Sequence, residues 1–383
     1  MSPKILTRVA PAALLALAVA VPFTAGTAEA AARGPLVSAE ILPLPADGTG
    51  GELIALNSGN QIAGAVSFPT GPRHVALWKG AAVTDLGVGS PSGINDRGQV
   101  VGTDSVVASG SYERTPKIWF RGKTTVITTP HKGYFVTSGI NSTGLVPLAS
   151  SSSPYGYHLE RLGVWSNGTY TPLNGNGPEL SLNVVTDNGL TAGALLPRTG
   201  TGYAYSCTAG TCTPLPTLPG ATGFYRVSAA NESGVLVGTV GSVGVRWSGG
   251  QVTALPAVAG ATSATVASGP QAINESGDVV GESGPHAALW RGGQAIDLGS
   301  PLGGRSAAVA VSDAGDVLGW TESPDGTQRH AFLWRAGTAT DLGSAGAPKA
   351  YPVAINDHGV IIGNGYTADY RSLPLRWKVR PVR

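Results

Sequence analysis

An asparagine-and-glycine pattern recurs eight times along the chain. An Asn-like residue is followed three positions later by Gly and seven positions later by a second Gly, as in Asn231, Gly234 and Gly238. The copies start at Asn57, Asn95, Asn141, Thr186, Asn231, Asn274, Ser312 and Asn356. A pattern that returns about every 43 residues is typical of repeat proteins, in which each unit is one small supersecondary element.

Each copy contains four short apolar segments separated by turn residues. In the copy that starts near Gln271, the segments expected to be strands are 272–273, 278–281, 286–290 and 295–299. Four strands within about 43 residues are the pattern of one blade of a β-propeller.

A tryptophan spacing supports the same division into strands. The Trp of the third segment is followed eight residues later by an aliphatic residue of the fourth, as in Trp247 and Leu255. Between them lies a two-residue turn that contains Gly, here 249–250. Gly supplies the positive φ angles that such hairpin turns require. The other turn lies between the first two strands. There we expect the Asn side chain to form a hydrogen bond with the backbone two residues on. The Gly three positions after this Asn is expected to adopt the left-handed backbone conformation.

The two ends of the repeated region complement each other. The eighth copy stops soon after Trp377 and lacks a fourth strand, whereas residues 40–44 form a surplus strand before the first copy. We therefore expect an all-β fold, a β-propeller of eight four-stranded blades closed by the N-terminal strand, with residues 31–383 as a single domain. A propeller of seven blades is the alternative, because the third copy has Leu148 where Gly is expected.

The first thirty residues have the features of a secretory signal peptide. Lys4 and Arg8 precede an apolar run at 9–21, which is too short to span a bilayer. Cleavage is expected after Ala30, with 31–32 as a near alternative, and no second long apolar run follows. The sequence therefore predicts a secreted, extracellular monomer with no membrane span after the signal peptide is removed.

The composition argues against nucleic acid as a partner. Removing residues 1–30 takes away two basic residues and one acidic residue, which leaves 23 basic and 22 acidic residues. No basic stripe is present to bind phosphates. The sequence also lacks the hydrolase, zinc-protease and phosphate-loop motifs, so it gives no catalytic residue, cofactor or metal site.

The third segment begins with His in three copies. Residues 330–334 read His-Ala-Phe-Leu-Trp, and 286–290 and 74–78 are close variants. This segment resembles the HAF-repeat family of predicted extracellular proteins. The resemblance covers about 57–377. It implies secretion and a β-rich repeat fold, and it brings no established catalytic residues.

Two cysteines are expected to form a disulfide bond across a hairpin. Cys207 stands in the Trp position of the fourth copy, and a two-residue turn at 209–210 places it opposite Cys212. Directly opposed residues in an antiparallel pair are close enough for a disulfide, and an exported chain meets an oxidising environment.

Three copies carry a His four residues before the Trp together with an Asp seven residues after it. Such residues lie diagonally on one face of a hairpin, within reach of each other. Because the pair recurs, we interpret it as a structural contact and not as a catalytic centre. The predicted pairs are His74 and Asp85, His286 and Asp297, and His330 and Asp341.

Acidic residues follow the first turn residue in six copies. Calcium binding is one hypothesis, but calcium needs six to eight converging oxygens and each turn offers a single carboxylate. We therefore expect solvated turn positions. These acids are Asp96, Asp187, Glu232, Glu275, Asp313 and Asp357.

Ligand binding is expected on the loops of variable length, which a propeller places on the face opposite the short, uniform turns. These loops carry aromatic residues, and Trp320 is the one Trp outside the repeated position. The candidate ligand-binding residues are Trp320, Tyr112, Tyr134, Tyr155, Tyr225 and Tyr366.

The expected function is a non-catalytic binding module for a polysaccharide or a protein partner. The alternative is an extracellular carbohydrate-active enzyme, a glycosidase or lyase, with two carboxylates in the central funnel. Its candidate acids are Glu113, Glu160, Glu282, Glu322 and Asp325.

Overall fold

The computed structural model describes residues 37–108, 111–153, 158–176, 180–195 and 202–380. The expected signal peptide and Tyr155 lie outside these ranges, and the side chain of Tyr112 is also not described. Within the described ranges, no helix is long and apolar enough to cross a membrane.

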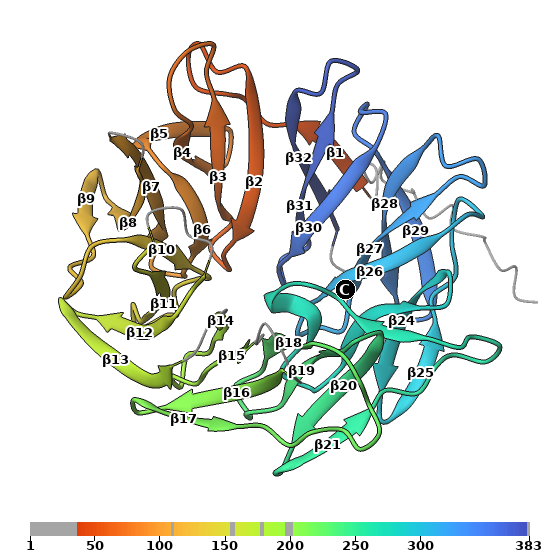
Figure 1. Ribbon diagram of the computed structural model, residues 1–383. Coiled ribbons are helices and arrows are strands. Elements are labelled where there is room, and N and C mark those ends of the chain that lie inside the picture. The colour runs from red at the N-terminus through yellow and green to blue at the C-terminus, as the bar shows by residue number, and fades with distance from the viewer. Residues whose placement is uncertain (1–36, 109–110, 154–157, 177–179, 196–201, 381–383) are drawn as a thin grey trace, which may run out of the picture. The chain divides into compact units, whose positions relative to one another are not determined.

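The described residues form an all-β structure with one short 3-10 helix, η1 (Pro270–Ala272). The strands follow one another along the chain in antiparallel groups (Figure 1). The first four groups are β2 (Gly50–Leu56), β3 (Gln61–Ser67), β4 (His74–Lys79) and β5 (Ala82–Val88); β6 (Ser90–Ile94), β7 (Val100–Ala108), β8 (Ser111–Phe120) and β9 (Lys123–Val126); β10 (Tyr134–Thr137), β11 (Val146–Ser151), β12 (Arg161–Ser166) and β13 (Thr169–Asn176); and β14 (Leu180–Val185), β15 (Thr191–Leu195), β16 (Tyr203–Thr208) and β17 (Thr211–Pro214).

The remaining groups have the same order. They are β18 (Tyr225–Ala230), β19 (Leu236–Val240), β20 (Val243–Ser248) and β21 (Gln251–Ala254); β22 (Ala264–Val266), β23 (Val279–Ser283), β24 (His286–Arg291) and β25 (Gln294–Asp297); β26 (Ser306–Val311), β27 (Val317–Glu322), β28 (Arg329–Arg335) and β29 (Thr338–Gly343); and β30 (Ala350–Ile355), β31 (Val360–Tyr366) and β32 (Ser372–Val379), which are joined by β1 (Val37–Ile41). Short parallel contacts join β8 to β10 and β20 to β22, so that these four groups form two eight-stranded sheets.

The N-terminal strand pairs with the last strand of the chain. β1 runs antiparallel to β32, with Ala39 opposite Trp377 (Figure 1). The strand lies three residues earlier than the expected 40–44. The ladder ends with the bond from Leu42 N to Pro374 O at 2.8 Å, because Pro43 has no N–H to donate.

Four of the repeated tryptophans connect neighbouring groups. Their indole N–H donates to a backbone carbonyl at the end of the preceding group, and the N···O distances are 2.7 to 3.1 Å. A buried indole N–H usually has such a partner. The bonds run from Trp78 to Pro43, Trp247 to Pro216, Trp290 to Pro256 and Trp377 to Leu342.

Both kinds of turn have the expected backbone conformation. The first Gly of the pattern is left-handed, for example Gly234 with φ of 76°, and Asn60 takes its place in the first copy with φ of 60°. The hairpin turn before β21 has positive φ at both Gly249 and Gly250. These predictions are confirmed.

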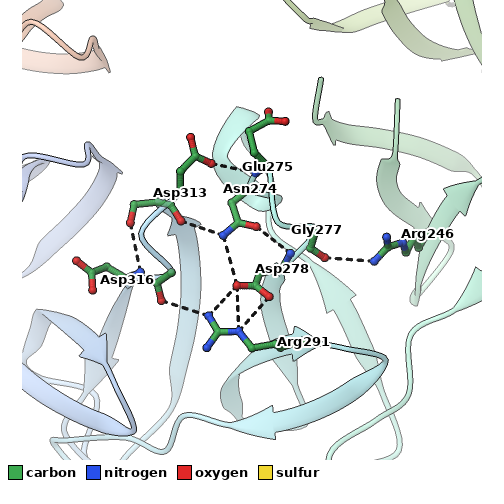
Figure 2. A network of polar contacts seen from close by, with 10 residues as sticks. Arg246, Asn274, Glu275, Gly277, Asp278, Arg291, Asp313 and Asp316 are labelled. Atoms are coloured by element: carbon green, nitrogen blue, oxygen red, sulfur yellow. Dashed lines mark hydrogen bonds and ion pairs between the residues drawn. The ribbon is translucent and has the colours of Figure 1, made fainter. Parts of the chain in front are cut away.

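The turn asparagines have a wider role than the sequence suggested. In the fifth group, Asn231 Oδ1 accepts from the N–H of Val235, four residues on, at 3.0 Å. Its amide nitrogen donates to the carbonyl of the next turn, that of Asn274, at 3.2 Å. Figure 2 shows the same arrangement at Asn274, whose amide points to the next turn while Arg291 holds Asp278. Each side chain thus stabilises its own turn and links it to its neighbour.

These links follow the chain order, except from the seventh turn, where Ser312 has no amide to donate, and they return to the start of the chain. Where Thr186 replaces Asn, the amide of Asn188 makes the bond instead, to Glu232 O at 2.8 Å. From the last turn, Asn356 Nδ2 donates to Asn57 O at 3.1 Å.

The acids beside the turn asparagines also connect adjacent turns. The carboxylate of Asp313, for example, accepts from the backbone N–H of Glu275 at 2.9 Å. The six turn acids are exposed, as expected, and in addition each accepts a backbone N–H of the preceding turn; they are Asp96, Asp187, Glu232, Glu275, Asp313 and Asp357.

The second Gly of the pattern is explained by a close backbone approach. A Cβ at Gly238 would lie 1.8 Å from the carbonyl oxygen of Arg226 on the adjacent strand. The strand pair there contains a β-bulge, where the register shifts between Val227 and Ala229. The third group has no register shift between β10 and β11, and there Leu148 is accommodated.

The predicted disulfide is confirmed. Cys207 of β16 and Cys212 of β17 are directly opposed, with Cα atoms 3.9 Å apart, slightly less than expected. Cys207 is buried beside Leu173 and Tyr205, in the position that Trp occupies in other groups.

Removing this disulfide should have a modest effect on stability. The double substitution Cys207→Ser and Cys212→Ser is expected to lower the free energy of unfolding by about 2 kcal/mol, because the bond closes only a short loop in the unfolded chain. Urea denaturation with and without reductant measures the difference. An unchanged unfolding midpoint on reduction, with loss of the bond verified by mass, would contradict this account.

Candidate functional site

Trp320 lies in the wall of a cavity of about 390 Å³, here called the Trp320 pocket. Volumes of this order are usual for small-molecule sites. The wall combines one aromatic ring with hydroxyl, charged and small apolar side chains. Its side-chain lining includes Arg226, Ser228, Thr239, Thr265, Val266, Ser268, Glu282, Val309 and Trp320.

Stacked side chains hold Trp320 in place. Trp320 is part of β27, between Ala307 of β26 and Ala331 of β28. The guanidinium carbon of Arg329 lies 4.3 Å from the centroid of the Trp320 ring and 4.6 Å from that of Tyr351. Cations over aromatic faces are attracted by the ring quadrupole.

A carboxylate fixes Arg329 in turn. Glu322 Oε1 accepts from Nη2 of Arg329 at 2.6 Å and from Nε at 3.0 Å. The stack continues from Tyr351 to Tyr366, whose ring centroids are 5.5 Å apart in an edge-to-face arrangement. The Trp320 indole is thus preorganised, which lowers the entropic cost of using it to bind a ligand.

The pocket also carries one cation and one carboxylate. Arg226 is exposed, and Glu282 is half-buried with its closest cation, Arg305, 3.5 Å away. Burial raises the pKa of Glu282, and the nearby Arg305 opposes this shift. These groups can form hydrogen bonds with a polar ligand that stacks on Trp320.

The other candidate aromatics have different surroundings. Arg114 lies 4.6 Å above the ring of Tyr134, and Tyr366 contacts Tyr351. The expectation that Tyr225 binds a ligand is wrong, because its side chain is 2% exposed and packs in the core of the fourth and fifth groups. Tyr112 and Tyr155 lie outside the side chains that the structure describes.

The three His and Asp residues of the repeat lie in contact. The Nδ1 atoms of His74, His286 and His330 are 2.8 to 2.9 Å from the nearest carboxylate oxygens of Asp85, Asp297 and Asp341. The same carboxylates accept the N–H of the Gly two residues on, at 2.8 Å. The contact ties the third strand to the end of the fourth. Among the described residues, no group of His, Cys, Asp or Glu could hold a metal ion.

The acids of the enzyme alternative are mostly engaged in local contacts. Hydrogen bonds from Ser323 and Thr327 lower the pKa of Asp325 to about 2. The Ser152 hydroxyl and N–H lower the pKa of Glu160 in the same way. Burial raises the pKa of Glu282, as described above. Glu113 of β8 is half-buried.

Sequence reasoning missed Arg329 and Arg226. Arg226 has unrelated residues in its place in the other copies, and Arg329 has one counterpart, Arg73, directly before His74. The position of Arg329 directly before the His-Ala-Phe segment, on the strand that pairs with the Trp320 strand β27, was the available signal.

Comparisons with known proteins bear on the fold. The sequence matches no family model and no curated protein. Among solved structures, the chain is similar to one from a study of two prolyl endopeptidases, with a TM-score of 0.53 and 12% identity over 88% of this chain and 55% of that chain. The chain thus spans just over half of that protein. The described strands form an all-β structure of antiparallel four-stranded groups, which is the construction of a β-propeller.

Two other similar structures have lower scores. The β-propeller domain of the Trilobed protease from Pyrococcus furiosus gives a TM-score of 0.49 and 8% identity, over 86% of this chain and 95% of that domain. Sqt1 from Saccharomyces cerevisiae gives 0.47 and 12%, over 88% and 98%. At such low identities, the similarity concerns the fold and not the activity.

Proposed function

We propose that this protein is a secreted, non-catalytic β-propeller of eight blades that binds a polysaccharide in the Trp320 pocket. Eight blades are supported by the groups β2–β5 through β30–β32, with β1 as the missing fourth strand of the last. The third group, which the seven-bladed alternative would discard, has four paired strands like the others.

Secretion is supported by the N-terminal segment and by the disulfide, since disulfides persist in oxidising compartments. Membership of the HAF-repeat family is supported by residues 330–332. There Phe332 is fully buried and His330 contacts Asp341, so that both motif residues have a structural role.

One observation carries the proposed binding function. The Trp320 indole, fixed by Arg329, forms part of a cavity wall that otherwise presents hydroxyl groups, one cation and one carboxylate. Sugars combine apolar C–H faces with many hydroxyls, and such a wall offers both an aromatic face and hydrogen-bonding groups. This mixture favours a polysaccharide over an apolar ligand.

Substitution of Trp320 tests the proposal. Affinity electrophoresis against soluble xylan, starch, β-glucan and glycol chitin should show retardation of the wild type by at least one of them. Trp320→Ala should weaken this binding at least tenfold, because truncating a central aromatic contact costs about 2 kcal/mol or more. Tyr370→Ala is the matched control, because Tyr370 is 88% exposed and lies outside the pocket.

The outcomes separate the candidate ligands. Wild-type affinity in Trp320→Ala, or no retardation by any polysaccharide, would refute the proposal. Binding of a defined purified protein that depends on Trp320, without polysaccharide binding, would assign the pocket to a protein partner instead.

A further inference from the structure

A second cavity, of about 460 Å³, is lined by residues from the first strand of each of the eight groups, or from directly after it in the third and sixth groups, and is here called the inner-strand cavity. Each group contributes the residue that stands three positions before its turn residue. The eight residues are Ile54, Ser92, Ser138, Asn183, Ser228, Gln271, Val309 and Val353.

β-Bulges expose this position to the cavity in most groups. In six of the described first strands the register shifts by one residue, and the unpaired residue is the one three positions before the turn. Bulges commonly redirect a side chain beside a binding site. In the sixth group the bulge is larger, because 267–272 lie between the paired residues Val266 and Ile273.

The wall of the cavity has a polar side and an apolar side. The second to sixth groups contribute the Ser, Asn and Gln residues, whereas the seventh, eighth and first contribute Val309, Val353 and Ile54. Hydrogen-bonding groups thus lie on consecutive groups, and the aliphatic residues lie on the other three.

Two hydroxyls in this wall have no partner. The Oγ atoms of Ser138 and Ser228 are buried and accept or donate no hydrogen bond within the described structure. The whole Ser228 residue is only 7% exposed. Asn183, which stands between them in group order, makes only long bonds of 3.3 and 3.4 Å. Buried polar groups are almost always satisfied, so unpaired hydroxyls facing a cavity indicate that water or a ligand bonds to them there.

The inner-strand cavity adjoins the Trp320 pocket at one end. At its other end, hydrogen bonds between Gln271 and Ile355 cross it. Ser228, Ser268 and Val309 line both cavities. At the end of the cavity nearer the Asn turns, the side-chain amide of Gln271 donates to the carbonyl of Ile355 and accepts from its N–H. Ile355 belongs to the eighth group, two groups after that of Gln271. The enlarged bulge of the sixth group lets Gln271 reach that far. A ligand that enters from the Trp320 pocket therefore meets this bridge.

We infer that the inner-strand cavity binds the terminal sugar unit of a neutral polysaccharide whose next units lie in the Trp320 pocket. This inference rests on the proposed function. The sugar hydroxyls bond to Ser138, Asn183 and Ser228, and the C–H face lies against Val309 and Val353. The bridge at Gln271 stops the chain, so the site recognises chain ends.

The double substitution Ser138→Ala and Ser228→Ala tests the inference. Isothermal titration with xylohexaose, maltohexaose, cellohexaose and chitohexaose should show affinity about tenfold weaker than that of the wild type for the hexaose that binds. Without sugar, the melting temperature should stay equal or rise, because the lost hydroxyls had no protein partner. A merely structural role would lower it. Ser283→Ala is the control: its hydroxyl bonds to Ser263 O at 2.8 Å outside both cavities, so it should lower stability and leave affinity unchanged.

The combined variants distinguish the two proposals. If Trp320→Ala abolishes binding and the double substitution does not, the inference is overturned and the proposed function stands. If only the double substitution weakens binding, the cavity binds sugar and the assignment to Trp320 fails. If none of the four hexaoses binds a wild type that a soluble polysaccharide retards, the inference is overturned and the proposed function stands. A crystal structure with the bound hexaose should show its end unit between Ser228 and Val309, and internal units there would also overturn the inference.

Discussion

Trp377→Ala is expected to lower the free energy of unfolding by about 3–5 kcal/mol, the usual range for removing a buried aromatic ring. Trp377 is fully buried in β32, opposite Ala39 of β1 and Ile361 of β31. Its indole N–H donates to Leu342 O of the preceding group at 3.1 Å. The substitution therefore leaves a cavity and removes one contact between groups where the two chain ends pair.

Urea denaturation followed by far-UV circular dichroism measures this loss. Trp377→Phe should cost less, because most of the ring volume remains and only the N–H contact is removed. Tyr370→Ala, at a position 88% exposed, should stay within about 0.5 kcal/mol of the wild type. If Trp377→Ala were as stable as Tyr370→Ala, the pairing of β1 with β32 would not support the core as described.

Features set by a few adjacent residues could be predicted from the sequence. The left-handed Gly234 and the two-residue turn at 249–250 follow from local steric limits, which hold in any fold. The bond between Cys207 and Cys212 follows from the same hairpin geometry. Strand β1 could be anticipated because the last copy lacked a strand, but its register could not, because Pro43 ends the ladder early.

The lining of the candidate site could not be predicted from the alternation of polar and apolar residues along the strands. A β-bulge shifts the inward and outward positions by one residue, so a strand such as β18 cannot be oriented from its sequence alone. Tyr225 consequently appeared as a loop aromatic, although it packs in the core. The polar residues of the inner-strand cavity had a visible signal, since Ser92, Ser138 and Ser228 each stand three residues before a turn Asn. That these side chains all line one cavity became clear only from the register of the paired strands.

Asn231→Asp should produce the second large effect, a loss of about 3 kcal/mol at neutral pH. The change preserves the Oδ1 acceptor for the Val235 N–H but replaces the donor that faces Asn274 O. Asn231 is 3% exposed, so a buried carboxylate would lie against a carbonyl without solvent, and unpaired buried charges are more costly than lost neutral hydrogen bonds.

This loss should depend on pH in a defined direction. Burial beside a carbonyl raises the folded-state pKa of the introduced carboxyl above its unfolded value of about 3.9. Below that value the carboxyl is protonated in both states, and its O–H can donate to Asn274 O as the amide did. The stability of the variant relative to the wild type should therefore be highest in acid and fall as the pH rises through the folded-state pKa.

Urea denaturation of both proteins between acid and neutral pH tests this behaviour. Asn188→Asp is the matched control, because Asn188 makes the equivalent bond to Glu232 O at 2.8 Å at an exposed position. Solvent screens the new charge there, so the loss should be smaller and vary less with pH. Equal losses at the two positions would mean that burial of the turn amides does not stabilise the contacts between neighbouring groups. In that case, the recurring Asn would be explained by the local turn alone.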